Sequence, residues 1–230
     1  MNTLSKVVFK AFSVVAAGVI STAANAVVLV TTSDPGYYND SIGNVLNNTN
    51  GGDTSVGYFP TFNDANVVFP VAPDLSAASA ALGNWLTDPL NLNANWTFEL
   101  SIPNSWALGT EVAVMYQFNT LGATNVVANF GVDNGIFAWL DGVYLGGARR
   151  AGGVSLGEHV FPVGNLSAGT HFLQLLLEDH GGSNGYAVQI TADTFIPGPG
   201  PVPEPGTLAL LGVGLMVMCA LRRRSGLSTY

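Results

Sequence analysis

Apolar and polar side chains alternate with a period of two residues in four separate stretches of the sequence. The alternating apolar positions are Trp96, Phe98, Leu100 and Ile102; Val112, Val114, Tyr116 and Phe118; Val126, Ala128, Phe130 and Val132; and Tyr186, Val188, Ile190 and Ala192. Successive side chains of a β-strand point to opposite faces of the sheet, so this period indicates half-buried strands. We therefore predict an all-β fold.

Turn signals and one helical segment complete the predicted domain, which covers residues 27–195. Asp141-Gly142 separates two short apolar runs and predicts a tight hairpin. Residues 170–177 predict a buried central strand, and residues 75–86 predict the single short helix. Short strands joined by Gly, Asn and Pro turns favour a single antiparallel β-sandwich of jelly-roll or galactose-binding type.

The N-terminus (1–26) predicts a secretory signal peptide. Two lysines precede an uncharged apolar run over residues 11–20, and Ala24 and Ala26 are small residues suited to a cleavage site after Ala26. A signal peptidase is therefore an expected processing partner. An N-terminal anchor helix is disfavoured because the apolar run is shorter than the roughly 20 residues that span a bilayer.

The C-terminus has three parts: a proline-rich spacer (196–206), an apolar segment (207–221) and a basic tail (222–230). The prolines of the spacer exclude a helix or a central strand. The apolar segment predicts a transmembrane helix of about 22 Å, short for a hydrocarbon core of about 30 Å. Arginines accumulate on the cytoplasmic side of membranes, so the tail is expected to stay there. The tail begins with the cluster Arg222, Arg223 and Arg224.

Val202, Pro203, Glu204 and Pro205, followed by the apolar segment and the arginine cluster, resemble the PEP-CTERM protein-sorting signal. The resemblance implies a Gram-negative, exopolysaccharide-producing bacterium and a precursor held in the inner membrane. It also implies recognition by an exosortase, a membrane-embedded transpeptidase-like enzyme, and delivery to the cell surface or the biofilm matrix. These four residues would then be a recognition motif. The segment is also called an ice-binding-protein C-terminal domain, a name that is no evidence of ice binding.

The charge distribution excludes nucleic acid as a partner. The formal net charge is −8, and every acidic residue except Glu204 lies between Asp34 and Asp193. Arg149 and Arg150 are the only basic residues in that region. Nucleic-acid binding needs clustered Lys and Arg, whereas an acidic domain suits a protein kept soluble among divalent cations and polysaccharide.

Residues 133–142 and 166–171 carry a second resemblance. They contain Asp-Asn-Gly, Leu-Asp-Gly and Leu-Ser-Ala-Gly-Thr-His in that order. This order is similar to that in bacterial lectin-like sandwich domains of the anthrax protective-antigen type, which recur in the exported parts of PEP-CTERM proteins. The acidic pair that chelates calcium in the sugar-binding members has no clear counterpart, which argues against calcium-dependent sugar binding.

The candidate ligand loop follows the predicted central strand. Carboxylates, a histidine and glycines there are suited to a hard cation such as calcium or to sugar hydroxyls. The alternative is a hairpin turn whose polar residues face water. The same two interpretations apply to the loops around residues 133 and 141. Of these two positions, residue 141 is interpreted as a turn residue. The candidates are Glu178, Asp179, His180 and Asn184, together with Asp133, Asn134 and Asp141.

Aromatic and histidine positions are divided between core and surface. His171 shares a strand face with apolar residues and is predicted to be packed and hydrogen-bonded. Trp96 alternates with core positions and is predicted to be structural, whereas Trp106 and Trp139 are predicted to be surface positions on which a sugar ring could stack.

The sequence contains no nucleophile elbow, phosphate-binding loop or zinc-ligand spacing. Cys219 is the single cysteine, so an intramolecular disulfide is excluded. We predict an exported non-enzymatic protein without a cofactor, either structural or associated with exopolysaccharide. The alternatives are a calcium- or carbohydrate-binding lectin-like module and a secreted hydrolase.

Overall fold

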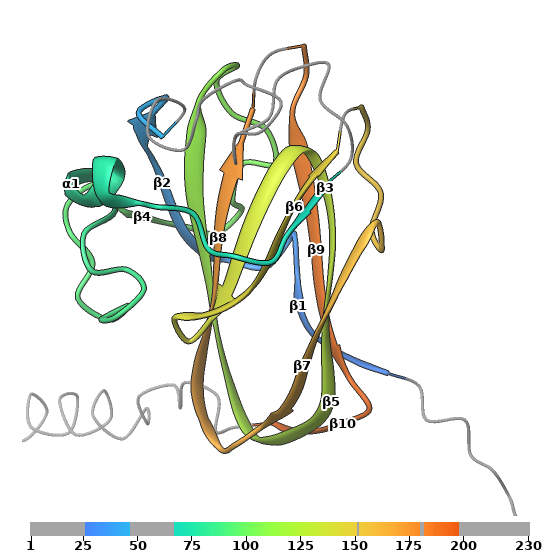
Figure 1. Ribbon diagram of the computed structural model, residues 1–230. Coiled ribbons are helices and arrows are strands. Elements are labelled where there is room, and N and C mark those ends of the chain that lie inside the picture. The colour runs from blue at the N-terminus through green and yellow to red at the C-terminus, as the bar shows by residue number, and fades with distance from the viewer. Residues whose placement is uncertain (1–25, 47–66, 151, 180–181, 198–230) are drawn as a thin grey trace, which may run out of the picture.

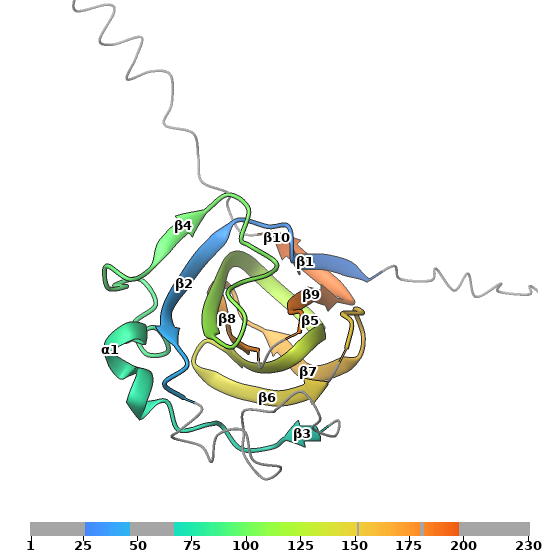
Figure 2. The ribbon, with the colours of Figure 1, turned by 90° about the horizontal axis from the view of Figure 1, so that it is seen from above.

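The computed structural model describes residues 26–46, 67–150, 152–179 and 182–197. All ten strands in these ranges belong to one antiparallel sheet, which curls around itself (Figures 1 and 2). The all-β prediction with one short helix is therefore confirmed in its coarse form. The structure does not divide this sheet into two stacked layers, so the sandwich stays a prediction.

The strands differ greatly in length, and the fifth is by far the longest. They are β1 (Val27–Thr31), β2 (Gly36–Gly43), β3 (Val67–Phe69), β4 (Thr97–Glu99), β5 (Glu111–Leu140), β6 (Val143–Arg150), β7 (His159–Leu166), β8 (Gly169–Glu178), β9 (Gly185–Ala192) and β10 (Thr194–Pro197). The order β1-β9-β5-β2-β4 forms one path; β6, β7, β8 and β10 also pair with β5, and β3 pairs with β6.

β5 organises the whole sheet because it reverses direction twice. Residues 111–120 pair with β2 and β8, and residues 123–133 pair with β7 and β9. Residues 134–140 then pair with β6 and again with β8. β8 therefore lies between two segments of β5, and the predicted buried central strand is confirmed for residues 171–178.

The two reversals define the two ends of the sheet. At the β5–β10 end, residues 120–124 pair with β10 and approach the turn between β7 and β8. At the opposite end, named here the Asp133 end, β5 reverses at Asp133 and Asn134, near the start of β9. Figure 1 shows β10 at the bottom of the molecule, with β1 entering from the same side.

The predicted alternation is confirmed in three of the four stretches. The even-numbered apolar residues of 112–116, 126–132 and 186–192 are all buried in one core cluster. A second cluster covers the other face of the sheet and includes Met115, Phe137 and Leu176. The central strands are therefore buried on both faces.

The fourth stretch, residues 96–102, is a correction. Phe98 and Leu100 are 58% and 80% exposed, and only the three residues of β4 are extended into the sheet. Trp96 packs in the second cluster and Ile102 in the first, so the chain passes from one face to the other. A regular alternation on one face is incompatible with that crossing.

The predicted helix 75–86 is shorter than expected. A 3₁₀ turn (η1, Ser76–Ala78) leads into α1 (Ser79–Leu82), and Asp74 Oδ1 accepts the Ser76 N–H at 2.9 Å. The helix ends at Gly83, whose φ of +61° is a left-handed value that glycine adopts without steric cost. The segment beyond it places Trp85 in the second core cluster.

Several predicted features lie outside the described residues. They are the signal-peptide site at Ala24 and Ala26, the spacer from residue 198 with Val202, Pro203, Glu204 and Pro205, the apolar segment, and the cluster Arg222, Arg223 and Arg224. The first two residues of the predicted spacer belong instead to β10, which ends at Pro197. Within the ranges that are described, none of the helices is long and apolar enough to cross a membrane.

Candidate functional site

Asp133 joins three loops at the Asp133 end. Its side chain is only 4% exposed. Asn134 Nδ2 and the Gly152 N–H donate to Oδ1 at 3.0 and 3.1 Å, and Ser183 Oγ donates to Oδ2 at 3.3 Å. Asp133 and Asn134 are thus brought together with the loop that follows β6 and the loop that precedes β9.

A second buried carboxylate, Asp179, connects the end of β8 to the loop before β5. Its Oδ2 accepts the Gly109 N–H at 2.6 Å, and its own N–H donates to the Thr110 carbonyl at 3.3 Å. Glu178 beside it is fully buried. The interpretation that the polar residues of this loop face water is therefore wrong for both carboxylates, which are 0% and 1% exposed. His180 lies outside the described residues.

Charged residues form one row across the sheet at this end. Arg149 pairs with Gly135, Gly135 with Glu178, and Glu178 with Glu111. A Cβ atom at Gly135 would collide with the Glu178 carboxylate, so the absence of a side chain at 135 makes room for that group. Arg149, Glu178 and Glu111 are all buried, and the Arg149 guanidinium lies 5.8 Å from the centre of the Phe69 ring.

Asn184 fastens two loops of the Asp133 end to each other. Its Oδ1 accepts the Trp106 N–H and its Nδ2 donates to the Trp106 carbonyl, each at 3.0 Å. The Trp106 indole Nε1 donates to the Thr110 carbonyl at 2.9 Å, and its ring lies 6.5 Å from the Tyr186 ring. Both side chains therefore have structural roles, and half-buried Trp106 offers only part of its ring to solvent.

The surface position predicted for Trp139 is wrong. This side chain is 3% exposed and packs against Trp85 and Tyr144, with ring centres 5.6 and 5.3 Å away. Alternation correctly places it on the face opposite Ile136, but the segment around α1 covers that face as well. Trp96 is buried, as predicted, and stacks on Trp85 at 5.5 Å.

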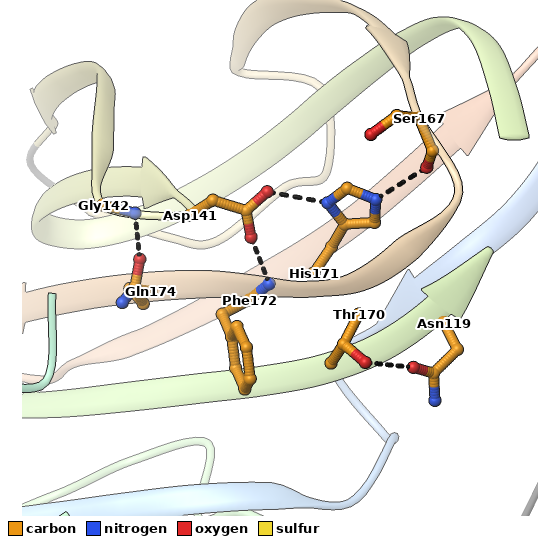
Figure 3. Close-up of polar contacts among 8 residues, drawn as sticks. All are labelled: Asn119, Asp141, Gly142, Ser167, Thr170, His171, Phe172 and Gln174. Atoms are coloured by element: carbon orange, nitrogen blue, oxygen red, sulfur yellow. Dashed lines mark hydrogen bonds and ion pairs between the residues drawn. The ribbon is translucent and has the colours of Figure 1, made fainter. Parts of the chain in front are cut away.

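Asp141 and His171 form a separate network away from Asp133 (Figure 3). Asp141 Oδ1 accepts the Phe172 N–H at 2.8 Å, and Oδ2 lies 2.7 Å from His171 Nδ1. His171 Nε2 lies 3.0 Å from the Ser167 carbonyl oxygen. The packed histidine is thus confirmed, and Asp141 is a turn residue that fastens the β5–β6 hairpin to β8.

The geometry of the hairpin agrees with its sequence. Asp141 and Gly142 have φ values of +51° and +75°, the left-handed pair that a tight two-residue turn requires. The Gly142 N–H donates to Gln174 Oε1 at 2.8 Å. The Leu-Asp-Gly and Gly-Thr-His motifs therefore meet in space as parts of one structural contact.

The described residues of the Asp133 end do not form the cluster of ligands that is typical of a cation site. Across residues 26–46, 67–150, 152–179 and 182–197, no group of three or more His, Cys, Asp or Glu side chains is arranged to hold a metal ion. Asp133 and Asn134 do place carboxylate and amide oxygens, the hard ligands that calcium prefers, on adjacent residues. Both Asp133 oxygens already accept hydrogen bonds within the protein.

His159, at the start of β7, has a shifted pKa. Burial lowers the pKa of His159, and Arg150 lowers it further, whereas Glu158 acts in the opposite direction. Arg150 Nε lies 3.6 Å from Glu158 Oε1, and Glu158 Oε2 accepts the Val132 N–H at 3.4 Å. The loop between β6 and β7 is therefore held to β5 by charged side chains.

Sequence reasoning missed Glu111, Arg149 and Gly152, and it included Ser183 only as one position of the candidate loop 178–185, not as a candidate ligand. Charged residues at the ends of otherwise apolar strands are the signal that could have found the first two. The others contribute a backbone amide and a hydroxyl in glycine-rich loops, for which the sequence carries no distinguishing signal.

Residues 201–224 match the PEP-CTERM protein-sorting motif. The resemblance of the C-terminus is thereby confirmed. The motif implies an exported protein whose precursor is anchored in a membrane and processed by an exosortase. No curated protein sequence matches the chain.

Three solved structures are distantly similar to this chain. An anti-sigma factor domain-containing protein is 12% identical (TM-score 0.34), and the match covers 49% of this chain and 46% of that one. The PA14 sugar-binding domain of an RTX adhesin is 14% identical (TM-score 0.34; 72% and 95% covered). The PA14 domain of the MpAFP antifreeze protein is 15% identical (TM-score 0.32; 73% and 88%). The two PA14 domains are of the type that residues 133–142 and 166–171 resemble, but likenesses this distant carry no argument about function.

Proposed function

We propose that this protein is a non-enzymatic component of the cell surface or biofilm matrix that associates with exopolysaccharide through the Asp133 end. The observation that carries the proposal is the sorting motif at 201–224, attached to an acidic β-domain. Export places such a domain among polysaccharide and divalent cations, where a net negative charge favours solubility.

The Asp133 end has the chemistry that this role requires. Sugar hydroxyls are bound by side chains that both donate and accept hydrogen bonds, such as amides, hydroxyls and carboxylates. Ser183 is exposed and Asn184 is half-buried in the loop that precedes β9, whereas Asn134 is 3% exposed. Asn134 and Ser183 donate to Asp133, and Asn184 accepts from Trp106, so these bonds hold the loops in place. A binding surface ordered in advance loses less conformational entropy when a ligand binds.

Co-sedimentation of the mature protein with exopolysaccharide purified from the native host tests this function. We expect Ser183→Ala to weaken association severalfold while leaving the fold intact, since Ser183 contributes a single long hydrogen bond at 3.3 Å. Ser167→Ala is the matched control, because it removes an exposed hydroxyl in the turn between β7 and β8, at the opposite, β5–β10 end. Equal binding by wild type and Ser183→Ala would contradict the assignment to this end.

A calcium- or carbohydrate-binding lectin-like module is the second candidate. The adjacent carboxylate and amide of Asp133 and Asn134 favour it. Titration calorimetry of the mature protein with calcium chloride, followed by a glycan array with and without calcium, separates the two candidates. A heat of calcium binding that is seen with wild type and lost in Asp133→Asn would support the lectin-like module. If wild type shows no heat of calcium binding, any association with exopolysaccharide is independent of calcium.

The non-enzymatic part of the proposal needs its own test, because a secreted hydrolase is the remaining alternative. A broad panel of glycosidase and esterase substrates is expected to show no turnover. Turnover that is lost in Asp179→Ala or His180→Ala would contradict this expectation and locate the activity in the loop after β8.

A further inference from the structure

The chain leaves the sheet toward the predicted signal peptide and toward the predicted transmembrane segment at the same end. Val27 at the start of β1 pairs with Ala192 at the end of β9. β10, which ends at Pro197, pairs with residues 120–124 of β5. These contacts place the exits toward the predicted signal peptide and toward the sorting motif at the β5–β10 end (Figures 1 and 2).

We propose that the anchored precursor stands with its β5–β10 end against the lipid surface and its Asp133 end directed away from it. The inference rests on the anchorage implied by the sorting motif and goes beyond the proposed function. It assigns Leu121 and Ile196 to the contact with the bilayer.

The length of the spacer supports this orientation. Roughly ten residues separate Pro197 from the predicted transmembrane segment, and even a fully extended chain of that length reaches only about 35 Å. Residues 123–133 of β5, which run from one end of the sheet to the other, are about 33 Å long at the usual strand rise. Turning the Asp133 end to the membrane would therefore require the spacer to run fully extended along the whole sheet.

Two exposed apolar side chains lie at the end assigned to the lipid. Leu121 is 52% exposed and Ile196 is 56% exposed, and β-pairing sets Ile196 opposite Gly122, next to Leu121. The two arginines of the described chain, Arg149 and Arg150, both lie toward the Asp133 end. The lipid-facing end thus has two exposed apolar side chains beside the point where the chain leaves the sheet, together with one exposed carboxylate, Asp193, which accepts from Asn125.

Fluorescence quenching by lipid-attached nitroxides tests the orientation. Single cysteines are introduced into the full mature chain in a Cys219→Ala background, labelled with bimane, and reconstituted into phosphatidylethanolamine–phosphatidylglycerol vesicles. Leu121→Cys and Ile196→Cys report on the proposed contact. Leu108→Cys and Leu156→Cys are the matched controls, since these leucines are also exposed but lie toward the Asp133 end.

We expect nitroxides at the lipid headgroups to quench bimane at 121 and 196 severalfold more than at 108 and 156. If the protein floats with the vesicles but sites 108 and 156 are quenched as much as or more than sites 121 and 196, the orientation alone is overturned. Failure to float would overturn the anchorage and the orientation together. Labelling of the unlabelled cysteine variants in membranes with and without the exosortase is a second measurement. If none of the four sites is quenched, and sites 121 and 196 are protected from labelling only when the exosortase is present, this end contacts the enzyme and the proposed lipid contact is overturned.

Discussion

At the residue scale, Asp141 shows how a local turn signal becomes a tertiary contact. Its positive φ is a property of the turn, and asparagine and aspartate tolerate that conformation. Its carboxylate then accepts from the Phe172 N–H and contacts His171, both on β8. Sequence reasoning predicted the turn and the packed histidine separately, but not that they contact each other.

Asp141→Ala is expected to destabilise the protein by about 1–3 kcal/mol, because it leaves the Phe172 N–H and His171 Nδ1 without their acceptor. Asp141→Asn keeps the turn preference and one acceptor oxygen, so its loss should be smaller. Urea unfolding of both variants, with the surface variant Asp193→Asn as control, measures the effect. Equal stability of Asp141→Ala and wild type would show that the contact contributes nothing.

His159 predicts a dependence of stability on pH. Its pKa is lowered in the folded state, so the unfolded chain binds a proton more readily. The contribution of His159 to stability is fully present above the usual histidine pKa of about 6.5 and is lost as pH falls through the lowered folded value.

The urea midpoint of wild type is therefore expected to fall more than that of His159→Gln between about pH 7.5 and 5.5. His171 is present in both proteins, so the difference isolates His159. Parallel pH profiles for the two proteins would contradict the shift.

At the scale of elements, Gly135 makes room for a buried carboxyl group between two neighbouring strands. Glu178 on β8 fills the space that a side chain at 135 on β5 would occupy. Gly135→Ala is expected to cost about 1–3 kcal/mol, because the added methyl group overpacks a closed site.

A double-mutant cycle with Glu178→Ala checks this cause. If the collision is responsible, the methyl group at 135 should cost much less once the carboxylate is gone, and the two unfolding free-energy changes should not add. Additive changes would mean that Gly135 matters for another reason, such as its backbone conformation.

At the scale of the whole molecule, the β-domain and the sorting motif make one joint prediction about processing. Protein recovered from the surface or matrix of the native host should begin at Val27 and end close to Pro203, Glu204 and Pro205. Intact-mass and terminal-peptide mass spectrometry measures both ends. A recovered chain that still contains Arg222 to Arg224 would instead indicate a protein that stays anchored in the membrane.

The sequence by itself determined the strands at 112–118, 126–132 and 186–192, the hairpin at 141–142 and the sorting motif at 201–224. These features depend on periodicity or on a few adjacent residues, so they can be predicted from short stretches of sequence. Only the tertiary structure decided that Trp139 is buried and that Glu178 and Asp179 face inward. It also decided that Asp133 meets Gly152 and Ser183. Those outcomes depend on which distant segment covers each face of the sheet. A period of two residues predicts the face on which a side chain lies, but it does not predict which segment covers that face.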